Sequence, residues 1–514
     1  MSSLPTPSSS DPLSRRAFLG VVGRTAVAGS GAAAALSGCG GGASRPQPHP
    51  ATRSPPVEAQ RFRSRSDLRP PAIHVGTRPP DPKAQSFVFT DCHGGNGQQG
   101  PMIIDRGGRL VWFEPVSEHG STRKRVFNVR VQSYRGEPVL TWWQGSIVGA
   151  HGHGHYEILD QTYAGVARVR AGNGYQGDLH EFRLTDRGTA LLTSYGRAEG
   201  QLPVHSGSGT RRGAYLYGVV QEVDVATGRV LLQWRSDEHV PVEASLHGPP
   251  PADPAIPWDY FHVNSIAVDP DDDNLLISGR NVWACYKVHR HTGEVIWSLG
   301  GRDSDFQVAD GAQFAFQHHV IPHGDGLLTI FDNESGPPSQ ASQSRGLVLR
   351  LDHSSRRATL VREYLHDPPV LSAALGSVQA LDTGGAFLGW GDSSYFTEYD
   401  AHGAVVLDAR LASGVLSYRA FQDAWAGRPA QPPRIAVRRA GADAHVYVSW
   451  NGATVHRRWR LLGGLRGNEL RELRSVPVRG FETAISVRSA PRWLAVEALD
   501  HDDQPLARSA SVRA

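Results

Sequence analysis

A short strand, a tight glycine turn and a second strand recur along this chain, and that repeat limits the folds it can adopt. The later copies follow one another at intervals of roughly 50 to 65 residues, the size of one four-stranded propeller blade. The clearest copies are DRGGRLVWF (105–113), DVATGRVLLQW (224–234), HRHTGEVIWSL (289–299) and YDAHGAVVLDARL (399–411), with a weaker copy, LDHSSRRATLVREYL, from residue 351. The repeat predicts an all-β chain whose sheets pack around a common axis.

The repeat ends near residue 427, which divides the chain into two predicted folded parts. About 340 residues, from 85 to 426, suffice for six blades. Residues 427–514 instead alternate apolar and polar side chains between hairpin loops, a pattern typical of a β-sandwich. The composition agrees, because 57 Gly and 35 Pro with only 2 Met favour turns over long helices. We expect an all-β fold, a six-bladed β-propeller followed by a C-terminal β-sandwich of fibronectin or immunoglobulin type.

The amino terminus has the features of an export signal rather than of a folded domain. A twin-arginine pattern, SRRAFL, begins at Ser14, and a small-residue apolar run ends in LSGC at Cys39. LSGC resembles a lipobox, in which the cysteine receives the lipid; a signal with an incidental cysteine is the alternative. We expect a twin-arginine signal with lipobox over 1–39, a flexible tether over 40–84, and a lipoprotein anchored on the outer face of the cytoplasmic membrane.

The charge balance bears on nucleic-acid binding, and the cysteines bear on a possible disulfide. The chain has 53 Lys and Arg against 50 Asp and Glu, a formal charge of +3, which offers no electrostatic basis for binding nucleic acid. Only Cys92 and Cys285 remain after the signal. They could form a disulfide in an oxidising compartment or stay as two buried, inert thiols, and their spacing does not decide between these.

One glycine-rich segment has the spacing of a nucleotide-binding loop. GGNGQQG (94–100) contains G-x-G-x-x-G. In dinucleotide folds such a loop opens a helix, but here Pro101 and a predicted hairpin follow. The segment therefore does not predict a nucleotide cofactor.

A histidine-rich segment offers possible metal ligands. His151, His153 and His155 alternate in HGHGHYEILD, so one face of an extended segment would carry three imidazoles, which could hold zinc or copper. Glycines separate them, and no nearby cysteine or carboxylate cluster completes the set. A turn at the rim of a pocket is the favoured interpretation.

Three other histidines and one arginine lie where predicted strands begin or end. These are His180, His262, Arg280 and His318. A single histidine in such a place is usually structural, but four polar residues in equivalent places of successive blades predict a shared site at the axis. Arginine matches a tetrahedral oxyanion, and neutral imidazole is a nucleophile near pH 7. The chemistry indicated is group transfer to or from an anionic ester.

The motifs around these residues resemble those of the bacterial arylsulfotransferase family, in its actinobacterial lipoprotein-like branch. The resemblance covers residues 62 to 425. Its motifs are GPMIIDRGGRLVWF, DLHEFRLTDRGTALLTSY, YFHVNSIAVDPDDDNLLISGRN, FQHHVIPHGDGLLTIFDN and GSVQALDTGGAFLGWGDSSYFTEYDAHG. The resemblance implies a six-bladed propeller that moves a sulfuryl group between phenols through a sulfohistidine. It implies no nucleotide donor, no cofactor and no metal.

The resemblance also implies roles for individual residues. His318 in QHH matches the nucleophile, whereas its neighbour His319 stands where relatives commonly have Asp; on an extended chain the two side chains point to opposite faces. His262 and Arg280 match the pair that grips the sulfuryl oxygens, and His180 matches a further channel histidine. Asn264 in HVNS and Gln317 are expected substrate contacts.

The expected function is sulfuryl transfer from a phenolic sulfate ester to a phenol, in ping-pong order. The partners are then small aryl sulfates and phenols, with membrane contact through the lipid anchor and an oligomeric state that the sequence does not specify. The alternative is a non-catalytic propeller at the cell surface that binds an aromatic, anionic or carbohydrate ligand.

Overall fold

A computed structural model describes residues 59–77, 79, 86–95, 97–116, 124–203, 209–248, 250–253, 256–336 and 339–514. Over these residues the chain is all-β, as predicted, with three single-turn 3-10 helices, η1 (Ser236–Glu238), η2 (Val242–Ala244) and η3 (Gly391–Ser393). Within the described part, no helix has the length and apolar character needed to span a bilayer. The predicted signal, Cys39 and the first part of the predicted tether lie outside the described residues.

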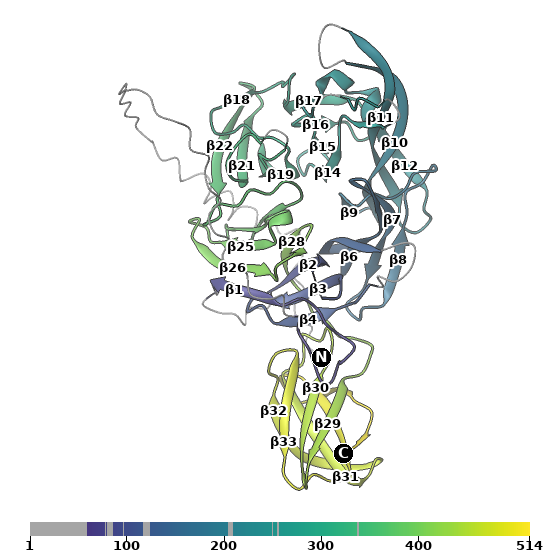
Figure 1. Cartoon of the computed structure of the whole chain (residues 1–514), viewed down its shortest axis with the longest axis vertical. Coiled ribbons are helices and arrows are strands. Elements are labelled where there is room, and N and C mark those ends of the chain that lie inside the picture. The colour runs from purple at the N-terminus through teal and green to yellow at the C-terminus, as the bar shows by residue number, and fades with distance from the viewer. Residues whose placement is uncertain are drawn as a thin grey trace, which may run out of the picture.

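Sheets of four or five strands follow one another around a ring (Figure 1). In chain order their strands are β1 (Ile73–Thr77), β2 (Ser86–Gly94), β3 (Gly100–Asp105), β4 (Leu110–Phe113), β5 (Arg125–Tyr134), β6 (Glu137–Val148), β7 (His151–Leu159), β8 (Gly165–Val169), β9 (Phe182–Leu184), β10 (Thr189–Pro203), β11 (Thr210–Asp224), β12 (Val230–Arg235), β13 (Trp258–Asp259), β14 (Val263–Val268), β15 (Leu275–Gly279), β16 (Ala284–Val288), β17 (Val295–Gly300), β18 (Gln307–Val308), β19 (His318–Gly324), β20 (Leu327–Asp332), β21 (Arg345–Asp352), β22 (Arg357–Tyr364), β23 (Ser377–Ala380), β24 (Ala386–Gly389), β25 (Tyr395–Tyr399), β26 (Val405–Leu411), β27 (Val415–Leu416) and β28 (Ala420–Ala424). Within the sheets the orders are β27-β2-β3-β4 with β28 on β2, β5-β6-β7-β8, β12-β11-β10-β9 with β13 on β11, β14-β15-β16-β17, β18-β22-β21-β20-β19, and β1-β26-β25-β24-β23.

Each predicted strand-turn-strand unit is the last hairpin of one sheet. The hairpins β3–β4, β11–β12, β16–β17, β21–β22 and β25–β26 occupy the five repeats. An aspartate closes several of these turns. Asp400, for example, accepts the backbone N–H groups of His402 and Ala404, and Gly403 has a φ of 86°. The β7–β8 hairpin is the unit that the repeat did not reveal: Asp160 closes its turn as in the other units, but Tyr163, with a φ of 64°, stands where the clearest repeats have glycine.

The two ends of the ring meet in shared sheets. β28 pairs antiparallel with β2, and β1 pairs antiparallel with β26. The flexible tether predicted for residues 40–84 is therefore wrong for the stretch 59–77. Leu68 in this stretch is fully buried in an apolar cluster that includes Phe387 and Leu407, so the prolines and glycines around it did not prevent ordering.

The residues after 427 form a separate unit below the ring (Figure 1). One sheet has the order β29-β30-β33 and the other β32-β31-β34-β35, with β36 on β34. Their apolar faces meet around Trp459, Leu461 and Val496, all nearly or fully buried. The strands are β29 (Arg434–Ala440), β30 (Asp443–Ser449), β31 (Arg458–Arg466), β32 (Glu469–Pro477), β33 (Glu482–Val487), β34 (Trp493–Leu499), β35 (Pro505–Arg508) and β36 (Val512–Arg513).

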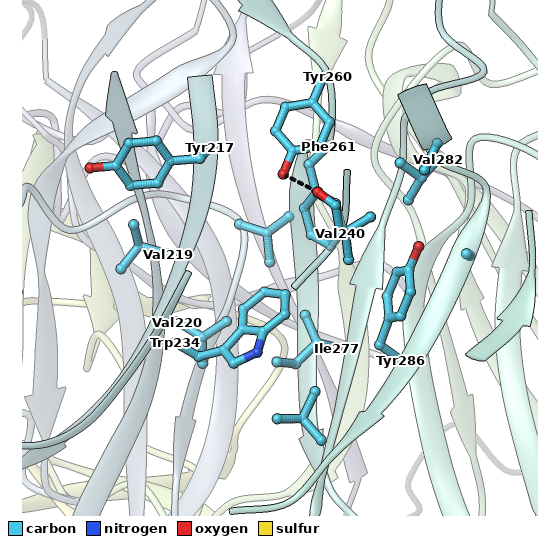
Figure 2. Packing of buried hydrophobic residues seen from close by; sticks show 14 of the residues in the cluster. Tyr217, Val219, Val220, Trp234, Val240, Tyr260, Phe261, Ile277, Val282 and Tyr286 are labelled. Carbon is cyan, nitrogen blue, oxygen red and sulfur yellow. Dashed lines mark hydrogen bonds between the residues drawn. The ribbon is translucent and has the colours of Figure 1, made fainter. Parts of the chain in front are cut away.

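Apolar side chains between neighbouring sheets hold the ring rigid. Figure 2 shows one such cluster, in which Trp234 of β12 lies near Ile277 of β15. Tyr260 buries its ring there and donates its hydroxyl hydrogen toward the Val240 carbonyl at 3.0 Å, so its polar end is satisfied. Cys285 lies in another cluster and, like Cys92, is a free buried thiol, so the disulfide left open by the sequence does not form.

Candidate functional site

The four predicted site residues lie at the ends of strands in neighbouring sheets. His180 lies two residues before β9, His262 directly precedes β14, Arg280 directly follows β15, and His318 begins β19. The three imidazoles are between 1% and 6% exposed. The ring fold therefore brings together residues separated by up to 138 positions, as the sequence predicted.

Hydrogen bonds assign the tautomer of His318. The amide nitrogen of Asn333, which follows β20, donates to the carbonyls of Ser372 and Leu375, both at 3.1 Å. The Asn333 oxygen therefore faces His318, where it accepts the Nδ1–H at 2.7 Å. The Nε2 of His318 then carries a lone pair, which accepts the Leu375 N–H at 3.3 Å.

The environment keeps His318 uncharged. Burial lowers the pKa of His318 well below its ordinary value, and the nearby positive charge of Arg280 lowers it further. A neutral imidazole is the form that attacks an electrophile, once its Nε2 lone pair is released from the Leu375 N–H. The tautomer and the lowered pKa of His318 are those that a nucleophilic histidine needs.

His180 and His262 face each other, and each is held by an aspartate. Their Nε2 atoms are 3.2 Å apart. The Nδ1 of His180 lies 2.6 Å from Asp178, and the Nδ1 of His262 lies 2.5 Å from Asp259. Burial opposes ionisation of Asp178, yet the His180 imidazole lowers the pKa of that carboxyl to about 2. Both carboxylates are charged, so both Nδ1 atoms carry hydrogens.

The facing nitrogens limit how this pair can be protonated. If both Nδ1 atoms donate to aspartates, two neutral rings direct two lone pairs at each other across 3.2 Å. A hydrogen bond between the two Nε2 atoms forms only when one of them carries an additional hydrogen. Burial lowers the pKa of His262 to about 4, which disfavours that hydrogen on His262. The pair offers a place where one proton can be taken up and given back.

Arg280 contacts the loop of residues 373–375, which also contacts His318. Its guanidinium donates to Asn281 at 2.8 Å and to the Ala373 carbonyl at 3.2 Å, and it lies 4.9 Å from the Phe316 ring centre. Ala373 is two residues before Leu375, whose N–H meets His318. Burial lowers the pKa of Arg280, but an arginine stays charged at neutral pH.

A cavity of about 460 Å³ lies one layer of side chains away from the histidine pair, and its wall includes none of His180, His262, Arg280 and His318. Its wall includes His151 and Tyr195, and the rings of both also contact His262, at 5.6 and 5.9 Å between ring centres. Tyr175 and Tyr217 add two further aromatic walls. Its volume is in the range of small-molecule sites, and its walls suit a flat aromatic ligand.

The two predicted substrate contacts have different surroundings. Gln317 is fully buried, and its amide nitrogen lies within 3.2 Å of the Ser278 hydroxyl and the carbonyls of Gly279 and Ala284. We interpret Gln317 as a positioning residue for the start of β19 rather than a substrate ligand. Asn264 is also fully buried; it donates to the Gln317 carbonyl at 2.7 Å, and its own oxygen has no partner among the described residues.

The two adjacent histidines have separate surroundings, as strand alternation predicted. His319 packs against Phe421 and lies 3.1 Å from the Val378 carbonyl, away from Asn333 and Leu375. Regular alternation is not the whole reason, because the β19–β20 register shifts after His318 and the φ of His319 is 48°. A bulge therefore turns the two side chains apart.

The histidine-rich segment does not form the predicted row of three ligands. His151, at the start of β7, contacts Asp259 at 3.0 Å, whereas His155 contacts Glu157 at 2.9 Å and His153 is exposed. His151 does line a cavity, which agrees with the favoured interpretation of a pocket rim.

Several site residues were not found from the sequence. These are Asp178, Asp259, Asn333, Tyr195 and Leu375. The aspartates had a usable signal, because each precedes a predicted site histidine by two or three positions, in D-x-H and D-x-x-H. Asn333 had no such signal. It follows β20 and His318 begins β19, so only the pairing of these two strands brings the side chains together.

Comparison with known proteins gives one family. The family model described as Arylsulfotransferase (ASST) matches residues 130–412, more than half of the chain. No curated protein matches the sequence.

Solved structures with some similarity share little sequence. A protein of unknown function from Bacteroides caccae is 12% identical, with a TM-score of 0.37 over 66% of this chain and 98% of that one. A catalytically inactive virginiamycin B lyase from Staphylococcus aureus, crystallised with quinupristin, is 9% identical, with a TM-score of 0.34 over 73% and 95%. The β-propeller domain of Myceliophteria thermophila Cps50 is 12% identical, with a TM-score of 0.31 over 58% and 90%.

Proposed function

The chain belongs to the arylsulfotransferase family, and on that premise we propose that it transfers a sulfuryl group from an aryl sulfate to a phenol through a sulfohistidine at His318. The single observation that carries the proposal is the hydrogen-bonded tautomer of His318, with Nδ1–H on Asn333 and the Nε2 lone pair directed at the Leu375 N–H. We also interpret the ring as a six-bladed propeller and residues 427–514 as a β-sandwich, on the basis of the sheet orders.

In the first half-reaction the Nε2 of His318 attacks the sulfur of the donor. The N–S bond forms as the S–O bond to the aryl group breaks, and the phenolate leaves with the bonding electrons. We assign the binding of the sulfuryl oxygens to Arg280 and to the Leu375 N–H, which leaves Nε2 as the N–S bond forms, and Asn333 stabilises the positive charge on the modified ring through Nδ1–H. A proton taken up between His180 and His262 neutralises the phenolate.

In the second half-reaction an acceptor phenol returns that proton. The histidine pair, now one proton short, accepts the phenolic hydrogen, and the phenol oxygen attacks sulfur as the N–S bond breaks. The His318 lone pair and the proton of the histidine pair are both restored. The order is ping-pong, because the first product leaves before the second phenol reacts.

The decisive experiment measures the intact mass of the protein after brief exposure to 4-nitrophenyl sulfate. We expect an adduct of roughly one SO3 unit on the peptide that contains His318, as covalent catalysis requires. The adduct should be absent from His318→Ala. It should be present in His319→Ala, the control, because His319 is also a buried histidine but contacts Val378 and Phe421 instead. Equal loss in both variants would show that His318 is not the nucleophile.

Export and anchoring are a separate proposal, supported by the twin-arginine pattern and by LSGC at Cys39. We propose that the protein is exported by the twin-arginine route and held by a lipid on Cys39 at the outer face of the cytoplasmic membrane. Cys39→Ala should then release it into the soluble fraction of a cell fractionation, while Cys92→Ala should not. Membrane retention of the Cys39 variant would contradict the lipobox.

A further inference from the structure

Three side chains beside the proposed catalytic site offer ligand atoms at the spacing of a metal centre. His151 of β7, Asp259 of β13 and His262 each present one ligand atom, and these atoms all lie within 4.8 Å of one another. They come from three successive sheets of the ring, since β7, β13 and β14, which His262 directly precedes, belong to different sheets. Two imidazoles and one carboxylate are a frequent ligand set for Zn²⁺.

The distances fit a small divalent ion after a modest rotation of the carboxylate. Ligand atoms around tetrahedral zinc are about 3.3 Å apart, given bonds near 2.0 Å. His151 Nε2 lies 3.0 Å from Asp259 Oδ2, close to that value. His262 Nδ1 lies nearer, at 2.5 Å from the same oxygen, so the ion needs Asp259 to turn.

Asp259 has one oxygen left without a partner. Its Oδ1 is a buried acceptor that no group among the described residues contacts, whereas its Oδ2 contacts both imidazoles, so an ion would replace the hydrogens in those two contacts. A buried acceptor without a partner is costly, and a cation would satisfy it.

A route for the ion and an open coordination position are also present. His151 forms part of the wall of the 460 Å³ cavity beside the pair. An ion held by three protein ligands there would keep its fourth position for water or a small ligand from the cavity, as zinc sites with three protein ligands do. A second group of possible ligands, Asp500, His501 and Asp502, lies on an exposed turn and has no such enclosure.

We propose that His151, Asp259 and His262 form a binding site for a divalent transition ion, with Zn²⁺ as the best match, and that occupancy inhibits the enzyme. The second half of this statement rests on the proposed function. An ion on the Nδ1 of His262 takes that lone pair, which moves the ring hydrogen to Nε2. The Nε2–H of His262 then points at the Nε2 lone pair of His180, so neither ring has a free Nε2 for proton exchange with a phenol.

The test is titration of the full-length, metal-free protein with Zn²⁺ alone, followed by calorimetry. We expect one ion per chain in the enclosed site. Binding should weaken by more than about 100-fold in His151→Ala, because loss of a residue that merely supports a ligand already costs about 10- to 100-fold. Visible absorption of Co²⁺ in the same site should report tetrahedral coordination by nitrogen and oxygen.

Two matched variants separate the outcomes. His153→Ala removes an exposed neighbour on the same strand and should leave binding unchanged, and His501→Ala should remove weak surface binding only. Loss of all tight binding in His501→Ala, or no Zn²⁺ uptake at all, would overturn the site.

Inhibition is scored separately, in wild type, as the rate of SO3 adduct formation with and without Zn²⁺. Tight binding that leaves this rate unchanged would overturn the inhibitory role. Absence of the adduct from the metal-free protein would instead contradict the proposed function and leave the binding result standing.

Discussion

Asn333 decides which nitrogen of His318 carries the lone pair. Its amide is fixed by two backbone carbonyls, so its oxygen can only accept from the histidine. An isolated histidine prefers neither role strongly, and the choice is therefore made by a residue 15 positions away. The proposed role of His318 depends on this contact as much as on the histidine itself.

Replacement of Asn333 by leucine should slow formation of the sulfohistidine about tenfold. A hydrogen bond of this kind stabilises by about 1.5 kcal/mol, and 1.36 kcal/mol corresponds to a factor of ten in rate. The measurement is the rate of SO3 adduct formation in a rapid-quench experiment. Asn333→Asp keeps an acceptor oxygen and should lose less, whereas an unchanged rate in Asn333→Leu would show that the tautomer is set by another group.

At the scale of elements, strand ends carry the site and strand interiors hold it in place. His262, Arg280 and His318 each flank or begin a strand in which most residues are buried. The backbone is left-handed at His262 and Phe316, with φ of 54° and 55°, a conformation that costs about 1 to 3 kcal/mol in bulky residues. Such strain persists where surrounding packing over-determines it, as it does here.

The composition of residues 59–77 led to the prediction of a tether, although this segment is part of the fold. Its prolines and polar residues resemble those of a tether, but Leu68 is 0% exposed and β1 pairs with β26. Leu68→Ala should lower the free energy of unfolding by about 2 to 5 kcal/mol, through lost burial and the cavity left behind.

Denaturant titration of the full-length protein measures the effect of Leu68→Ala. Leu465→Ala is the matched control, because Leu465 is 81% exposed and its truncation should change stability by less than about 0.5 kcal/mol. Equal stability of the Leu68 variant and wild type would mean that 59–77 contributes nothing to the fold.

At the scale of the whole molecule, buried histidines make stability depend on pH. Burial lowers the pKa of His262 and of His456 to about 4, and it lowers the pKa values of His318 and His319 well below the ordinary value. Between pH 6.5 and 4 the unfolded chain takes up protons that the folded chain excludes. Stability should therefore fall as pH falls through this window, by up to about 1.4 kcal/mol per pH unit for each histidine.

Denaturation midpoints at pH 7, 6 and 5 test this dependence. His456→Gln removes one buried histidine far from the site and should make the decline shallower. His151 and His366 have the opposite sign: burial opposes their charge, but aspartate partners raise their pKa values, so their contribution is present at low pH and lost as pH rises above 6.5. A midpoint that rises from pH 7 to pH 5 would contradict the prediction.

The sequence by itself determined the all-β class and most of the outer hairpins, and it singled out His180, His262, Arg280 and His318 as polar residues at strand ends. These features are encoded in short windows, because turn residues and alternation act over a few positions and the family motifs are contiguous. The β7–β8 unit escaped because Tyr163, with a φ of 64°, stands in its turn where the clearest repeats have glycine.

Only the tertiary structure decided how the ring closes, which tautomer His318 adopts, that His180 faces His262, and that His151 contacts Asp259. Each of these is a contact between residues that lie 15 to over 300 positions apart. Pattern within a window carries no information about such pairs, because they form only when sheets from distant segments pack around one axis and bury the polar groups that must then find partners.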